Sequence, residues 1–262
     1  MRILITGITG RIGGNLAAQL LEQGHQVRGL VWPKDPRIEK FKDLDLELIE
    51  GSLTEYEDVQ KVTEGMDVVY HLGAAFQGGG PFQDTDYFDI NVRGTFHMLK
   101  AAEASDTLKQ FIFASTDAQY AKYPIEGMDK PIREDHEPSK PTGWYALSKS
   151  MGEELCNGYW RTSHLPITIL RFSMVVGAGE ILDFRQFYLS KMKDRDDLQN
   201  VWKGEERLLL LKDMKGRAFK KHIADVRDIV HGCICALGKT EAAGQTIQLG
   251  GPRPFTWDEA VP

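Results

Sequence analysis

The chain has 262 residues, of which 42% are hydrophobic and 27% charged, a composition that excludes intrinsic disorder and collagen-like repeats. Its 32 Lys and Arg residues against 38 Asp and Glu residues give a formal net charge of −6, so we expect no nucleic acid and no membrane surface as a partner. The lack of a secretion signal or membrane-length apolar stretch, with only three cysteines, predicts a cytoplasmic protein with free thiols.

Short apolar runs alternate with longer segments of helical period, the pattern of βαβ units in a parallel sheet. Strands are predicted at residues 2–6, 26–31, 46–50, 67–71, 110–114 and 167–171. Helices are predicted between them at residues 12–23, 55–64, 87–104 and 144–162. We therefore expect an α/β fold with a doubly wound parallel sheet of the Rossmann type and the strand order 3-2-1-4-5-6.

The rhythm changes after about residue 177, and residues 178–262 are predicted to form a smaller mixed lobe that binds the substrate, with its sheet and helices interleaved with the first domain. In this lobe, helices are expected at residues 182–193 and 225–237, and short strands at residues 208–211 and 246–249. Thr256 and Glu259 have the spacing of a capping box at the start of a helix. Because that helix is only beginning, we expect the natural chain to continue past Pro262.

Three glycines, Gly7, Gly10 and Gly13, lie between the first predicted strand and the first predicted helix. In this context the first glycine permits a tight turn, the second a close approach of the backbone to a pyrophosphate, and the third close packing of helix on strand. The motif predicts that residues 1–177 form a dinucleotide-binding domain.

Two further groups have the chemistry of a proton-transfer site. Tyr145 and Lys149 are four residues apart near the start of a predicted helix, so the phenol and the ammonium share one helical face and the positive charge favours the phenolate. Ser115 and Thr116 end a buried-looking strand at the edge of the sheet where ligands bind. A hydroxyl there can bond a substrate oxygen while Tyr145 exchanges the proton.

The motifs together resemble the extended short-chain dehydrogenases/reductases, also called the NAD-dependent epimerase/dehydratase family. Besides the glycine loop and the Tyr-Lys pair, the resemblance rests on five ordered segments: DVVYHLGAA (67–75), NVRGT (91–95), LRFS (170–173), HIADV (222–226) and GGP (250–252).

The resemblance implies that Tyr145 is the catalytic acid and base, that Lys149 lowers its pKa and holds the nicotinamide ribose, and that Thr116 or its neighbour Ser115 contacts the reacting oxygen. Hydride then moves between the substrate carbon and nicotinamide. No metal is expected. The residues expected to contact the cofactor are Gly7, Thr9, Gly10, Arg11, Ile12, Trp32, Ser52, Leu53, Leu72, Gly73, Ala74, Ala114, Tyr145, Lys149 and Phe172.

The sequence departs from the family pattern at the cofactor site. No acid stands at Val31, the end of the second strand, where NAD-preferring members hold the ribose hydroxyls. A 2′-phosphate can instead meet one of four nearby cations, which are Arg11, Arg28, Lys34 and Arg37. NAD and NADP therefore both remain open as cofactors, and Trp32 is a candidate to stack on the adenine.

It also departs at the substrate site. Ala118 replaces the Glu of the Thr-Asp-Glu triad of dehydratases. Met174, or Ser173 if the register shifts by one residue, stands where sugar-nucleotide members have an Asn. Arg217, Lys220 and Lys221 are candidates to clamp a diphosphate in its place.

The sequence therefore predicts an NAD(P)-dependent oxidoreductase or epimerase acting on a secondary alcohol or ketone, of a sugar or sugar nucleotide. The alternatives are an NADP-dependent reductase of a non-nucleotide carbonyl compound and a non-catalytic dinucleotide-sensing protein. Residues 77–81 are expected to form a loop that closes beside the nicotinamide. The helices at 87–104 and 144–162 are expected to pair in a homodimer, as the resemblance implies.

Overall fold

The structure is a computed structural model that describes residues 1–76, 82–120, 124–135, 141, 143–196 and 198–260. The loop expected at residues 77–81 lies outside the described residues. Among the residues that are described, no helix is both long and apolar enough to cross a membrane.

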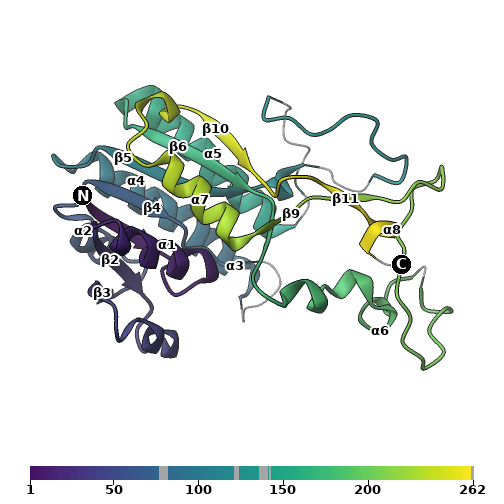
Figure 1. Cartoon of the computed structure of the whole chain (residues 1–262). Helices are drawn as coiled ribbons and strands as arrows, with labels where there is room; N and C mark the ends of the chain where they lie inside the picture. The colour runs from purple at the N-terminus through teal and green to yellow at the C-terminus, as the bar shows by residue number, and fades with distance from the viewer. Residues whose placement is uncertain (77–81, 121–123, 136–140, 142, 197, 261–262) are drawn as a thin grey trace.

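A seven-stranded parallel sheet forms the centre of the molecule (Figure 1). Its strands are β1 (Arg2–Thr6), β2 (Gln26–Val31), β3 (Glu47–Glu50), β4 (Val68–His71), β5 (Gln110–Thr116), β6 (Ile167–Phe172) and β10 (Thr246–Leu249). Every residue of β4, β5 and β6 is buried, as expected for strands covered on both faces. The spatial order is β10-β6-β5-β4-β1-β2-β3, which confirms the predicted order 3-2-1-4-5-6 and adds a seventh strand.

That seventh strand comes from the segment assigned to the smaller lobe. The strand predicted at residues 246–249 is present, but it pairs in parallel with β6, with Thr246 opposite Ile169 and Leu249 opposite Phe172. The same segment of chain also supplies the helix α7 (Val226–Ala236), which packs against α1 (Arg11–Glu22). The sheet domain therefore includes residues on both sides of the division predicted at residue 177.

Helices cover both faces of the sheet, and each face has its own apolar core. On one face, α1 and α7 bury Leu16, Leu20 and Ile229 against β1, β4 and β6. On the other face lie α2 (Tyr56–Thr63), α4 (Gly94–Glu103) and α5 (Trp144–Ser163). All of these helices were predicted from their apolar periodicity, with ends within one residue for α1, α2, α5 and α7.

The helix predicted at residues 87–104 differs in its first half. It begins with the short α3 (Asp84–Asp86) and continues as a π-helix, η2 (Tyr87–Arg93), before α4. The wider turn contains Asn91, whose side chain bonds the backbone of Ala75 at both N–H (2.7 Å) and C=O (3.0 Å) and also donates to Ser148 Oγ (2.9 Å). Asn91 thus fixes local backbone on two neighbouring elements, which periodicity alone does not reveal.

The smaller lobe lies beyond the carboxyl ends of the strands (Figure 1), and here two predicted elements were wrong. The helix expected at residues 182–193 is broken into η4 (Glu180–Asp183), η5 (Arg185–Phe187) and α6 (Leu189–Met192). Phe187 and Leu189 are both buried although they are two residues apart, and a continuous helix would place them on nearly opposite faces. In place of the strand expected at residues 208–211, the structure has a single bridge between Leu208 and Tyr188.

Two small sheets complete this lobe. β7 (Met174–Val176) pairs in parallel with β9 (Ile223–Asp225), and β8 (Lys220–Lys221) pairs with β11 (Phe255–Thr256) in antiparallel fashion. The helix α8 (Trp257–Ala260) follows, with the Thr256 N–H donating to Glu259 as the predicted capping box requires (2.8 Å). Trp257 is fully buried against Phe184 and Phe187, so it anchors the end of the described chain.

Candidate active site

The predicted functional residues converge on one edge of the sheet, at the carboxyl ends of β1, β4, β5 and β6. The strand register places Thr6 beside His71, His71 beside Phe113, and Thr116 beside Phe172. The glycine loop follows β1, the hydroxyl pair ends β5, and Tyr145 and Lys149 lie in the first two turns of α5. Open α/β sheets bind their ligands at this edge.

The glycine loop has the geometry of a phosphate cradle. Gly7 has φ +71°, and a Cβ added there would stand 2.7 Å from the Gly73 nitrogen. A Cβ on Gly13 would stand 2.4 Å from the Gly7 oxygen, so the start of α1 packs directly on the turn. Within the described helix Arg11–Glu22, the first turn holds no acidic side chain, which leaves the positive end of the helix dipole to a bound anion. The loop therefore fits the pyrophosphate of a dinucleotide.

A buried chain of hydrogen bonds supports this loop from below. The Gly73 N–H donates to Thr6 Oγ1 (3.0 Å), which contacts His71 Nδ1 (2.8 Å), and His71 Nε2 contacts Thr95 Oγ1 (3.0 Å). The Thr95 hydroxyl donates to the Asn91 carbonyl (2.6 Å). Burial, with a smaller contribution from the charge of Lys149, lowers the pKa of His71 to about 3, so the ring is neutral at physiological pH. His71 thereby joins β1, β4 and α4 beneath the glycine loop.

Tyr145 lies at the centre of the site. The side chain of Thr116 lies beside its hydroxyl, and Phe76 meets its ring edge-on at a centroid distance of 5.3 Å. Burial raises the pKa of Tyr145 to about 12, hydrogen bonding with Thr116 opposes this shift, and the charge of Asp117 adds to it. The phenol is therefore protonated at physiological pH.

Lys149 lies one helical turn beyond Tyr145 and is almost fully buried. Its Nζ is 4.1 Å from the centroid of the Phe113 ring, and burial lowers its pKa to about 8. The pKa of Tyr145 is raised by burial, and Lys149 is not among the groups that shift it, so the expected lowering by Lys149 is not found. That part of the expectation stays a prediction for the protein with its cofactor bound.

The structure separates the two candidate hydroxyls. Thr116 lies beside Tyr145 and its Oγ1 accepts from the Ala118 N–H (3.1 Å), whereas Ser115 Oγ accepts a hydrogen bond from Gln119 Nε2 (2.8 Å). Gln119 Nε2 also donates to Glu153 Oε1 (2.5 Å). Thr116 is therefore the hydroxyl next to Tyr145, and Ser115 belongs to a separate polar network.

Sequence reasoning missed the core of that network, a buried ion pair. Arg171 donates to both carboxylate oxygens of Glu153 at 2.8 and 2.7 Å, and it also bonds the Tyr120 hydroxyl. Both charged side chains are 7% exposed or less. A signal was present, because Glu153 is four residues after Lys149 and an acid on the buried face of a helix requires a partner.

The remaining predicted cofactor contacts lie along the same edge. Leu72, Gly73 and Ala74 follow β4. Ala114 lies two residues before the end of β5, and Phe172 is the last residue of β6. The Ile12 side chain packs into the core. Trp32 is 47% exposed after β2, as a stacking platform requires. Leu53 is buried, and the Ser52 hydroxyl bonds Thr54 (2.8 Å).

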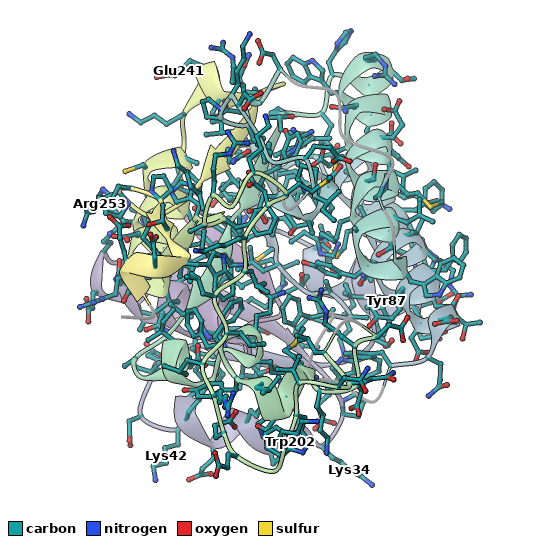
Figure 2. The ribbon with its side chains drawn as sticks, turned by 90° about the vertical axis from the view of Figure 1, so that its right-hand side faces the viewer. Lys34, Lys42, Tyr87, Trp202, Glu241 and Arg253 are labelled. Carbon is teal, nitrogen blue, oxygen red and sulfur yellow. The ribbon has the colours of Figure 1, made fainter. Side chains whose placement is uncertain are left out.

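Three of the four cations considered for a 2′-phosphate are already paired. Arg11 bonds Glu180 (2.6 Å) and the Val175 carbonyl, and Arg28 bonds Glu47 (2.6 Å). Arg37 bonds Asp35 (2.7 Å), while Lys34 extends outward from the surface (Figure 2). Asp35 was not foreseen by the sequence analysis. It accepts a hydrogen bond from Thr9 Oγ1 (2.9 Å) in the glycine loop.

Two of the three cations considered as a diphosphate clamp, Arg217 and Lys221, already have other contacts. Arg217 bonds Asp213 (2.7 Å) and Asp129 (3.0 Å), Lys221 lies over the Phe184 ring at 4.8 Å, and Met174 is half-buried in β7. Across the part of the chain that the structure describes, no group of three His, Cys, Asp or Glu residues could hold a metal ion.

A doubly wound sheet, a glycine loop and a Tyr-Lys pair with a hydroxyl partner define a dinucleotide-binding protein of the short-chain dehydrogenase/reductase type. The profile of the NAD dependent epimerase/dehydratase family matches residues 3–250. The chain therefore belongs to this family, whose members are enzymes of the extended short-chain dehydrogenase/reductase type.

Relatives and solved structures agree with this assignment. The uncharacterized UDP-glucose epimerase YtcB of Bacillus subtilis (strain 168) is 29% identical over 266 residues, which cover 96% of this chain and 77% of the relative. Against several other curated relatives, the chain spans only about half of their length.

Two crystal structures share the fold over nearly the whole chain. A short-chain dehydrogenase/reductase superfamily protein from Agrobacterium tumefaciens with bound NAD has a TM-score of 0.82 and 33% identity, covering 100% of this chain and 81% of its own. UDP-glucuronic acid 4-epimerase from Bacillus cereus, in complex with UDP-glucuronic acid and NAD, has a TM-score of 0.74 and 26% identity, covering 98% and 79%.

Proposed function

We propose that this chain is an oxidoreductase or epimerase that moves hydride between a nicotinamide dinucleotide and a carbon bearing a secondary alcohol or ketone. The observation that carries the proposal is the placement of Tyr145 beside Thr116, on the edge of the sheet that also holds the glycine loop. A protonated phenol beside a second hydroxyl is suited to hold a carbonyl oxygen and to give it a proton.

The residues of the site divide the work. Tyr145 gives a proton to a ketone oxygen in reduction and takes one from an alcohol in oxidation, and Thr116 holds the same oxygen. Lys149, buried one turn away, supplies a positive charge that favours the phenolate when the proton leaves. Asn91 and His71 join the surrounding elements and do not touch the reacting atoms.

The dinucleotide would be held along the whole edge, and when bound it supplies the hydride acceptor or donor. The backbone of Gly7 and Gly10 and the start of α1 would hold its pyrophosphate. Leu72, Gly73, Ala74, Ala114 and Phe172 would line its nicotinamide half. Trp32, Ser52 and Leu53 would meet its adenosine half.

For the substrate, we propose a sugar or a sugar nucleotide, because relatives with these substrates share the fold and the family. The second candidate is a carbonyl compound without a nucleotide. It is favoured by Met174, whose thioether cannot bond a phosphate as an amide does, and by the ion pairs that already hold Arg217. Calorimetric titration with UDP-sugars separates the two, since heat with none of them favours the second candidate.

The proposal is tested by Tyr145→Phe. Turnover of the nicotinamide dinucleotide with a panel of sugars, uronic acids and UDP-sugars should fall by about 10³-fold, because the proton donor is removed. Binding of the reduced dinucleotide, followed by its fluorescence, should be unchanged. Tyr159→Phe on the same helix is the matched control and should keep full turnover. Unchanged turnover in Tyr145→Phe would remove the proposed mechanism.

We also propose a homodimer. The segments η2, α4 and α5 expose five large apolar side chains, which are Phe88, Phe96, Trp144, Leu147 and Met151. Exposed apolar side chains that gather on neighbouring helices are typical of a subunit interface. Sedimentation at micromolar concentration should show a dimer that Phe96→Glu converts to a monomer, and a wild-type monomer would contradict this.

The cytoplasm is the compartment we propose for the enzyme. Cys156, Cys233 and Cys235 are all free thiols, and Cys235 is exposed. Free thiols persist in a reducing compartment.

A further inference from the structure

The segment after β2 folds back toward the glycine loop. The Asp35 N–H donates to the Trp32 carbonyl (3.1 Å), and Lys34 adopts φ 60° while its N–H donates to Glu50 (3.1 Å). This turn brings Asp35, four residues beyond the end of β2, into contact with Thr9. The last residue of β2 is not acidic, but the turn after β2 places the Asp35 carboxylate at the same edge of the sheet.

The Asp35 carboxylate is enclosed by hydrogen bonds. Its side chain is 3% exposed, and it accepts from Thr9 Oγ1 (2.9 Å), from the Arg37 N–H (2.9 Å) and from the Arg37 guanidinium (2.7 and 2.8 Å). The Arg37 guanidinium holds the pKa of Asp35 well below its usual range. Asp35 therefore keeps its negative charge and uses both the Thr9 hydroxyl and one edge of Arg37.

The position of this carboxylate matters for the adenosine ribose. In Rossmann folds, an acid near the end of the second strand meets the ribose 2′-hydroxyl of NAD, and an arginine there accommodates the 2′-phosphate of NADP. β2 pairs with β1 in register, with Leu30 opposite Thr6, so the turn after β2 and the glycine loop share this edge. A 2′-phosphate bound here would face an ionised carboxylate.

Two of the other cations are balanced by acids of their own, Arg11 by Glu180 and Arg28 by Glu47. Lys34 extends into solvent (Figure 2). Lys40 donates to the Thr9 carbonyl (2.7 Å), and its charge is attracted to the same Asp35 carboxylate. The groups best placed to bind a phosphate, the Thr9 hydroxyl and the Arg37 guanidinium, are the two that Asp35 holds.

We propose that Asp35 is the specificity-determining residue that makes this site select NAD over NADP, by holding the Thr9 hydroxyl and the Arg37 guanidinium and by repelling a 2′-phosphate. The inference rests on the proposed function, because it requires a dinucleotide at the glycine loop. The proposal assigns the selection between NAD and NADP to a residue that lies four positions after the last residue of β2.

The test is the ratio of the Kd for NADPH to the Kd for NADH, measured by fluorescence titration of the full chain without substrate. The wild type should bind NADH more tightly by at least about tenfold, and Asp35→Asn should lower the ratio by about tenfold or more, since it removes the repulsion and frees Arg37. The double variant Asp35→Asn/Arg37→Gln should lose most of that gain. Glu47→Gln frees Arg28 in the same way and is the matched control, with an unchanged ratio.

A second variant allows the proposal to be tested even if Asp35→Asn does not fold. Arg37→Gln leaves Asp35 unbalanced and should raise the ratio several-fold, so a lower ratio in this variant would overturn the proposal. Equal or tighter binding of NADPH by the wild type would overturn it too, as would an unchanged ratio in folded Asp35→Asn. If the folded wild type binds neither NADH nor NADPH, the proposed function is wrong. If it binds a nucleotide but Asp35→Asn does not change the ratio, only the role of Asp35 is wrong.

Discussion

The two ends of the binding edge handle their charged groups differently. Around β5, β6 and α5, the charged side chains Lys149, Glu153 and Arg171 are buried. Around β2 and β3, the pairs Arg28–Glu47 and Arg37–Asp35 each have at least one side chain in contact with solvent. The first end lies beside Tyr145, and the second beside the proposed adenosine site.

The comparison indicates that the burial of a charged side chain, more than the number of ion pairs, decides how strongly its charge affects stability and neighbouring pKa values. A buried charged side chain that loses its partner cannot be solvated by water, so the loss of the partner lowers the free energy of unfolding strongly. The same burial shifts the pKa values of ionisable groups nearby. A pair with one solvent-exposed member is partly screened by water, so the exposed member can rearrange at lower cost to the fold. We expect the reaction to depend on the end around β5, β6 and α5, and nucleotide choice on the end around β2 and β3.

The largest expected effect breaks the buried pair. Glu153→Gln leaves the Arg171 guanidinium buried without its counter-charge and should lower the free energy of unfolding by about 3–5 kcal/mol, measured by urea denaturation. Glu47→Gln removes the corresponding carboxylate from Arg28 at the end around β2 and β3 and should cost no more than about 1 kcal/mol. Equal losses in the two variants would contradict the comparison.

A second prediction sharpens the role of the end around β5, β6 and α5 in catalysis. Thr116→Val should lower turnover by about 100-fold, because Tyr145 loses its hydrogen-bond partner and the substrate oxygen loses a donor. Ser115→Ala is the matched control, since Ser115 bonds Gln119 and not Tyr145, and its turnover should stay within about threefold of the wild type. A larger loss in Ser115→Ala than in Thr116→Val would reverse the assignment.

The smallest effect is a pH dependence of stability. Because the pKa of Lys149 is lowered to about 8, the folded state binds fewer protons than the unfolded state between pH 8 and the ordinary lysine range, so stability rises with pH there. Comparison with Lys149→Met isolates this contribution from other groups. Relative to that variant, the wild type should gain about 1 kcal/mol between pH 7 and 9, measured by urea denaturation. If the difference in unfolding free energy between the wild type and Lys149→Met did not change with pH, burial would not be lowering the pKa of Lys149.

The sheet domain followed from the sequence because its strands and helices have a clear apolar period. The exceptions have local physical causes. β5 runs to Thr116, two residues beyond its predicted end, because both terminal hydroxyls find partners while still paired with β6. The π-helix at Tyr87–Arg93 follows from the bonds of Asn91, a tertiary effect that a periodic pattern does not encode.

The sequence indicated that Tyr145 and Lys149 share the start of one helix, and the structure has both in α5 with Thr116 beside Tyr145. Their catalytic roles stay predictions, and the residues that support them were missed. Asp35 was missed because its contact with Thr9 depends on a turn in which a non-glycine residue, Lys34, adopts positive φ. The broken helix of the smaller lobe was missed because its aromatic residues pack on Trp257, which is 70 residues away from Phe187 in the chain.

The place of β10 has a consequence for how the chain is made. The last strand of the sheet emerges from the ribosome only after residue 249, so until then β6 has an open edge of unpaired N–H and C=O groups. α7, which covers α1 and accepts hydrogen bonds from Tyr70 and Gln110, also arrives late. A nascent chain that ends at residue 177 lacks both elements, so it exposes the edge of β6 and the face of α1 that α7 covers.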